Sequence, residues 1–180
     1  MLIVNVPGRE YWDEENEKFK SVKAQELHLE HSLVSISKWE SKWHKAFLGK
    51  QEKTAEEMLD YVRCMCVTPN IPNEVFYSLT DENVKQINEY IKDPHTATVV
   101  TEAPGAHRNS DVMTSELIYY YMITLNIPVE FQKWHLNRLL TLIRVCNKKN
   151  SPPKKMGRSE LIARNDALNA KRRAALHSKG

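Results

Sequence analysis

The chain has 180 residues, of which 41% are hydrophobic and 27% are charged, an ordinary composition for a globular domain with or without an extension. The net charge is only +3, five glycines are present, and no apolar run approaches the roughly 18 residues that a bilayer-spanning helix needs. These features argue against a membrane-spanning protein, a Gly-rich phosphate-binding loop and a sheet-rich fold with many tight turns.

The charges are divided unevenly along the chain. Between Lys148 and Gly180 there are ten basic and two acidic residues, whereas the rest has 16 basic and 21 acidic residues. A mildly acidic body with a basic C-terminal extension suggests a polyanion or an acidic protein surface as a partner. The first residues lack a basic leader and a long apolar segment, and the number of cysteines is odd. We therefore expect a soluble, intracellular protein with reduced thiols.

Two strands are predicted near the N-terminus. Residues 2–6 (LIVNV) favour a short strand, which stops at Pro7-Gly8, a turn pair. Residues 26–31 alternate apolar and polar side chains, as in a half-buried strand. These two strands could pair with each other across the intervening polar loop.

Helices are predicted from there to residue 94. Ser32 or Ser35 is a candidate N-cap for a helix that ends at Gly49. Thr54 and Glu57 have the spacing of a capping box, with an apolar face following as far as Cys66. A further helix begins near residue 80, and Pro94 ends it. Residues 96–101 are β-branched and could form a third strand, and residues 102–110 resemble a loop.

The centre of the core is predicted to be a pair of helices within residues 111–149. Its first part is almost entirely apolar or aromatic from Leu117 to Leu125. Asn126-Ile127-Pro128 is the break, and Pro128 suits the first turn of the second helix. Beyond the pair, residues 150–157 form a Pro/Lys linker and residues 158–180 a basic helix. We expect a mostly α fold: a helical domain over residues 1–149 with a small antiparallel β element near the N-terminus, and a tethered C-terminal helix.

No known catalytic motif is present in the sequence. His28 and His31 could suggest a metal pair, but residues three apart on a strand face opposite sides. Cys64 and Cys66 point to different sides of a helix and are better read as core or boundary residues. A loop histidine and a nearby acid, His107 and Asp111, are a weak acid–base pair without a nucleophile. We therefore expect no enzyme activity, no cofactor and no metal.

Two sets of residues are candidates for binding a partner. Trp39 and Trp43 lie four apart on one helix face, where they could be core anchors or an interface. The C-terminal helix carries only a thin apolar stripe, so it is marginal without a partner. Its candidate contact residues are Leu161, Ile162, Leu168, Lys171, Arg172 and Arg173. The basic cluster lacks the interleaved aromatics of a single-strand binder, so docking or a solvated face is favoured over nucleic acid.

Three segments carry a resemblance to a known family. They are Leu29–Glu40 (LEHSLVSISKWE), Gln132–Asn147 (QKWHLNRLLTLIRVCN), and Pro152–Met156 (PPKKM) followed by Ala163–Asn169 (ARNDALN). Over residues 27–173 the chain resembles a family of small proteins of long-tailed bacteriophages, which is associated with the tail assembly chaperones.

The resemblance implies a role and no catalytic residues. A tail assembly chaperone coats the helical tape measure protein, keeps it soluble and recruits tail tube subunits in the host cytoplasm. It self-associates and is absent from the finished particle. Two alternatives remain open: a structural virion component, such as a connector or tail-completion protein, and a nucleic-acid-binding regulator that uses the break at residues 126–128 as a helix-turn-helix.

Overall fold

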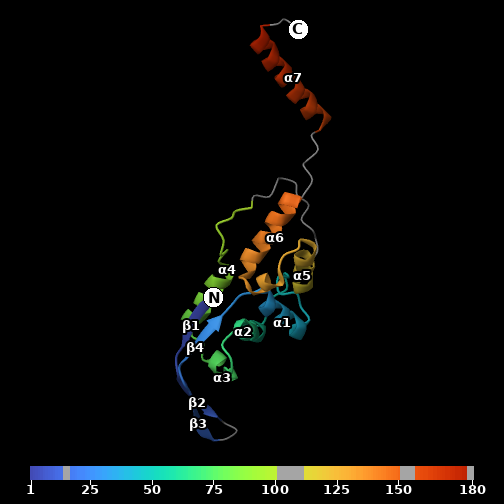
Figure 1. The fold of residues 1–180 in the computed structure, drawn as a ribbon. Coiled ribbons are helices and arrows are strands. Elements are labelled where there is room, and N and C mark those ends of the chain that lie inside the picture. Colours follow the sequence, from blue (N-terminus) through green and yellow to red (C-terminus); the bar gives the residue numbers. More distant parts are fainter. Residues whose placement is uncertain (14–16, 101–111, 151–156, 178–180) are drawn as a thin grey trace. The chain divides into compact units, whose positions relative to one another are not determined.

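The computed structural model describes residues 1–13, 17–100, 112–150 and 157–177 (Figure 1). The fold is mostly α-helical, with antiparallel strands near the N-terminus and a helix at the C-terminus, as the sequence predicts. The chain divides into two compact units, Met1–Lys149 and Asn150–Gly180, which are described separately. The His107–Asp111 pair, the loop at residues 102–110 and most of the Pro/Lys linker lie outside the described residues.

The N-terminal strands form a long two-stranded ribbon. β1 (Leu2–Val6) pairs antiparallel with β4 (Gln25–Leu29), which confirms the predicted pairing. The segment between them is a second hairpin, in which β2 (Arg9–Asp13) pairs with β3 (Lys18–Val22). The expectation of a loop here was wrong, because Arg9–Asp13 and Lys18–Val22 are strands whose polar side chains do not show the usual apolar alternation.

The two hairpins share one register. Val6 lies opposite Gln25 and Arg9 opposite Val22, so the ribbon passes Pro7-Gly8 without an extra residue in either strand. Pro7 has no amide hydrogen to give to a ladder, which accounts for the interruption. A Cβ on Gly8 would lie 3.0 Å from the carbonyl oxygen of Val22, so the strands approach each other closely at this point.

The helical part of the first unit follows the ribbon. Its elements are α1 (Leu33–Trp43), α2 (Ala55–Met65), α3 (Asn73–Tyr77), α4 (Asp81–Lys92), α5 (Ser115–Thr124), the 3-10 helix η1 (Val129–Lys133) and α6 (Leu136–Asn150). Capping boxes start three of them: Ser32 with Ser35 for α1, Thr54 with Glu57 for α2, and Thr80 with Asn83 for α4. The sequence predicts all three starts.

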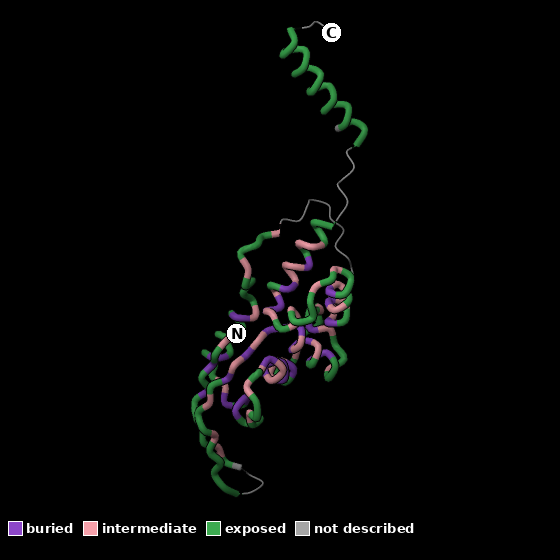
Figure 2. Tube along the Cα trace, in the orientation of Figure 1, coloured by how far each residue is buried: buried purple, intermediate pink, exposed green. Residues whose placement is uncertain are grey.

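The core lies where β1 and β4 meet the helices (Figure 2). Val4 and Leu27 from the strands, Trp39 from α1, Tyr61 from α2 and Leu139 from α6 are all completely buried. α1 packs on α2 and α5, whereas α4 packs on β1. These separate supports for α2 and α4 determine the shape of the surface between the two helices.

Three expectations about local structure were wrong. Residues 96–100 form no strand, because β-branched residues alone do not supply a neighbouring strand to pair with. α1 ends at Trp43 and not at Gly49, since His44 adopts a left-handed conformation with φ of 51°. Pro128 starts the 3-10 helix η1, and α6 begins only at Leu136. The connection from α5 to α6 is therefore longer than the turn of about 3–4 residues in a helix-turn-helix.

The second unit contains α7 (Arg158–Leu176). Every side chain whose burial is described along this helix is exposed (Figure 2). Its large apolar side chains, Leu161, Ile162, Leu168 and Leu176, form only a thin stripe along one side of the helix. A helix of this kind depends on a partner for most of its stability.

Candidate functional site: an apolar groove between two helices

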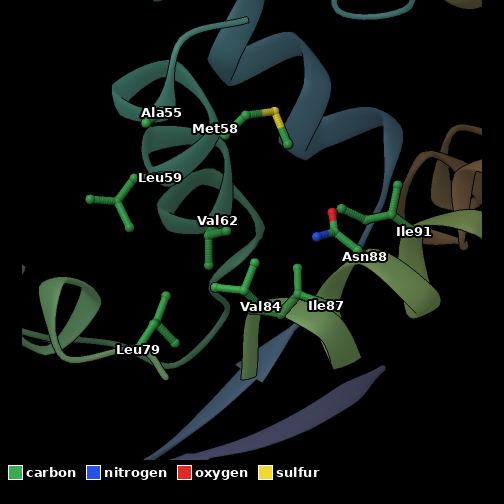
Figure 3. A pocket seen from close by; sticks show the side chains of 9 residues that line it. All are labelled: Ala55, Met58, Leu59, Val62, Leu79, Val84, Ile87, Asn88 and Ile91. Carbon is green, nitrogen blue, oxygen red and sulfur yellow. The ribbon is translucent and has the colours of Figure 1, made fainter. Parts of the chain in front are cut away.

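An apolar groove with a volume of about 340 Å³ lies between α2 and α4 of the first unit. Both helices present residues at the i, i+3, i+4, i+7 spacing of one helix face. The groove is lined by Ala55, Met58, Leu59, Val62, Leu79, Val84, Ile87, Asn88 and Ile91. Figure 3 shows these side chains arranged around the space between the two helices.

The chemistry of the groove is almost purely aliphatic. Asn88 is the one polar residue among its lining residues, and it is exposed. Val62 and Ile87 form the floor, being 8% and 3% exposed, whereas Val84 on the rim is 45% exposed. With so few polar groups to desolvate, the groove suits apolar side chains of a partner and offers nothing for proton transfer or nucleophilic attack.

The groove exists because its two walls are supported by different parts of the fold. Four side chains from α1 and its C-terminal end hold α2. The indole Nε1 of Trp39 donates to the carbonyl oxygen of Glu57 at 2.7 Å, and the indole of Trp43 donates to Asp60 at 2.8 Å. Lys42 donates to Asp60 at 2.6 Å, and Lys45 forms an ion pair with Glu57. These contacts fix α2 from the side away from the groove.

The acidic partners in these contacts are ionised. The hydrogen bond from Lys45 lowers the pKa of the Glu57 carboxyl, and the amide of Thr54 adds to the effect. Burial of Asp60 opposes its ionisation, but the hydrogen bonds from Lys42 and Trp43, together with the charges of Lys42 and Arg63, lower the pKa of this carboxyl. Both acids are almost fully buried and therefore need these donors to remain charged.

The opposite wall, α4, is held by the ribbon and by α6. The side-chain amide of Asn83 donates to the carbonyl oxygen of Asn5 at 3.3 Å, at the end of α4 nearest the ribbon. At the other end, Asn137 donates to the carbonyl oxygens of Ile91 and Asp93 at 2.9 and 2.8 Å. The hydroxyl of Tyr90 donates to Glu30 at 2.7 Å.

A cluster of aromatic polar groups lies behind α4. The rings of His31 and His135 lie 5.1 Å apart, and His95 stacks on His135 at 4.1 Å. His31 and the hydroxyl of Tyr61 share a hydrogen bond of 2.5 Å. The Nε2 atom of His135 donates to the carbonyl oxygen of Tyr90 at 3.0 Å.

Burial keeps two of these histidines neutral. Burial, with smaller contributions from His135 and His95, lowers the pKa of His31 to about 3. Burial also lowers the pKa of His135, although its bond to Tyr90 acts in the opposite direction. No group of three or more potential metal ligands occurs among the described residues. His31 and His135 are buried polar residues of the core, whereas His95 is exposed. Sequence reasoning missed the cluster, because only the fold brings these three histidines together.

The candidate partner residues of the sequence analysis have different environments. Trp39 is completely buried, so it belongs to the core and offers no surface to a partner. Trp43 is half-buried and lies beside Trp39, with their ring centroids 6.3 Å apart. The six candidates on α7, namely Leu161, Ile162, Leu168, Lys171, Arg172 and Arg173, are all exposed. The spacing of apolar residues predicts a helix face on each of α2 and α4, but it does not identify the groove between them as a binding site.

Comparisons with known proteins found no relative of this chain. No family model matches the chain, and neither a curated protein nor a solved structure matches it. None of the described helices has the length and hydrophobicity needed to span a membrane.

Proposed function

We propose that this protein is a tail assembly chaperone of a long-tailed bacteriophage, which binds the tape measure protein and promotes tail tube assembly through protein–protein contacts alone. The observation that supports this proposal is the open aliphatic groove between α2 and α4. The resemblance of residues 27–173 to such proteins supplies the identity of the client.

The groove fits the helix-in-groove mode of recognition. In that mode an amphipathic helix inserts apolar side chains spaced at i, i+3, i+4 and i+7 into a hydrophobic groove. The α2–α4 groove provides aliphatic walls on both sides and an exposed rim at Val84. A long helical client such as the tape measure protein presents repeated apolar stripes that must be kept from aggregating before assembly.

The C-terminal helix α7 supplies a second contact in this proposal. Leu161, Ile162 and Leu168 are between 43% and 52% exposed, which leaves apolar surface available to a partner. Lys171, Arg172 and Arg173 add positive charge near the end of the helix. A helix that buries no described side chain gains stability when it docks on the client, on tail tube subunits or on another copy of the chain.

The proposal places the protein in the host cytoplasm and not in the finished particle. A connector or tail-completion protein would instead remain in the virion, so mass spectrometry of purified particles distinguishes the two roles. A nucleic-acid-binding role is less favoured, because the connection between α5 and α6 is too long for a helix-turn-helix.

Co-expression tests the proposal directly. The tape measure protein encoded nearby is expressed alone and together with this chain, and its soluble fraction is measured. The proposal predicts that a complex purifies and that the soluble fraction rises. It fails if the tape measure protein is equally soluble alone and no complex purifies.

A further inference from the structure

The outer half of the ribbon, β2 with β3, has open edges. In the inner half, the outer edge of β4 is occupied: the amide of Val67 donates to the carbonyl oxygen of His28, and that of Glu30 to Met65, each at 2.9 Å. The β1 side is covered by α4. Within the described residues, β2 and β3 pair only with each other. Two strands alone are marginally stable in water, so pairing with a further strand would stabilise the β2–β3 hairpin.

An exposed aromatic pair lies on the same hairpin. Trp12 and Phe19 are opposite each other, with ring centroids 5.0 Å apart in an edge-to-face arrangement. They are 49% and 73% exposed. By strand alternation, Trp12 is in phase with the buried residues Val4 and Val6 of β1. The face of the ribbon that carries core side chains in its inner half therefore carries uncovered aromatic side chains in its outer half.

We propose that β2 pairs antiparallel with β2 of a second copy of this chain and forms a four-stranded sheet across a two-fold axis. Such an isologous contact uses the same surface on both copies and closes after two subunits. The inference is independent of the proposed function, since it uses neither the groove nor α7.

The charges of the two strands favour this edge over the other. β2 reads Arg-Glu-Tyr-Trp-Asp, so an antiparallel pair centred on Tyr11 places Arg9 opposite Asp13 of the second copy, twice. β3 reads Lys-Phe-Lys-Ser-Val, and an antiparallel pair centred on Lys20 places that lysine opposite itself. Opposite charges directly across a strand pair stabilise it, and like charges destabilise it.

The same register brings the aromatic residues together. With Tyr11 at the centre, Trp12 of one copy and Trp12 of the second copy lie on the same face as diagonal neighbours, about 7–8 Å apart. Phe19 flanks each of them on the outer strands. The four rings then form one apolar stripe, in place of two separately exposed pairs.

Oligomeric state under charge reversal is the first test. The full chain is measured by sedimentation equilibrium as the parent, as Arg9→Glu, and as Arg9→Glu combined with Asp13→Arg. We expect a parent dimer, a dissociation constant raised about tenfold or more in the single variant, and recovery in the double variant. A parent that is monomeric at all concentrations, or a dimer that Arg9→Glu leaves unchanged, overturns the proposal.

Crosslinking provides a second test that does not depend on stability. In the proposed register Tyr11 faces its own counterpart, with Cα atoms about 4.5–5.5 Å apart, within the range of a disulfide. The Tyr11→Cys variant should therefore form a covalent dimer on mild oxidation. The matched Lys20→Cys variant and the parent, with its three native cysteines, should not. Dimers in both variants, or in neither, contradict the β2–β2 contact.

Discussion

The indole nitrogen of Trp39 donates a hydrogen bond of 2.7 Å to the backbone carbonyl oxygen of Glu57, in the first turn of α2. Trp39 is completely buried, and so its ring also fills the space between α1 and α2. Because α2 forms one wall of the apolar groove, this contact links the core directly to the proposed binding surface.

Two substitutions of Trp39 should therefore lower the free energy of unfolding by different amounts. Trp39→Phe keeps most of the apolar contact but removes the indole donor to the Glu57 carbonyl and part of the buried ring, which should cost about 1–3 kcal/mol. Trp39→Ala also leaves a cavity and should cost about 3–5 kcal/mol. Urea unfolding followed by circular dichroism measures both. Tyr120→Ala, at an exposed aromatic residue whose ring contacts Tyr121, is the control and should cost about 1.5 kcal/mol or less, the contribution of an aromatic pair.

Acidification should destabilise the protein through His31. Its pKa is lowered to about 3 by burial in the folded state, whereas an unfolded histidine has a pKa of about 6.5. Between these values the unfolded chain binds a proton that the folded chain does not. Stability is therefore fully present above pH 6.5 and falls as the pH decreases toward 3, by at most about 1.4 kcal/mol per pH unit for this group.

The upper part of that pH range separates histidine from carboxylate effects. Glu57 and Asp60 also have lowered pKa values, but they start to protonate only near their unfolded values of about 4. Stability measured between pH 6.5 and 5 should slope downward in the parent and less steeply in His31→Gln. An equal slope in the two proteins would show that His31 is not held neutral.

Glu40 joins two segments that are distant in the sequence. Its carboxylate accepts from the amide of Phe47 and from the amide of Ser115 at the start of α5, both at 2.7 Å. Glu40→Gln replaces one of these acceptors by an amide group that can only donate, so one buried amide loses its partner. We expect a loss of about 2 kcal/mol in unfolding free energy. Glu56→Gln, an exposed acid on α2, should change stability by less than about 0.5 kcal/mol.

Local signals in the sequence were sufficient for the helices and insufficient for the contacts between them. The capping box of Thr54 and Glu57, and helix starts near Ser32 and Thr80, were recognisable because a helix start depends on residues only a few positions apart. β2 and β3 were missed because their mostly exposed side chains lack the apolar alternation of a half-buried strand.

The candidate site could not be predicted from local sequence patterns, because it depends on how the helices pack. The apolar faces of α2 and α4 could be predicted from the spacing of their residues. Whether other parts of the fold would cover those two faces completely could not be predicted. That depends on α2 resting on α1 while α4 rests on β1. Trp39 and Trp43 were equally ambiguous, since the same spacing serves a core or an interface; the structure places Trp39 in the core.

Binding of the tape measure protein to groove variants tests the central claim most directly. Val84→Glu introduces a charge at the groove rim, at a side chain that is 45% exposed, so the fold should tolerate it. Val99→Glu makes the same change at a side chain that is 89% exposed and outside the groove. Isothermal titration with the purified tape measure protein should show affinity reduced more than tenfold by Val84→Glu and unchanged by Val99→Glu. Equal affinities in the two variants would contradict the account.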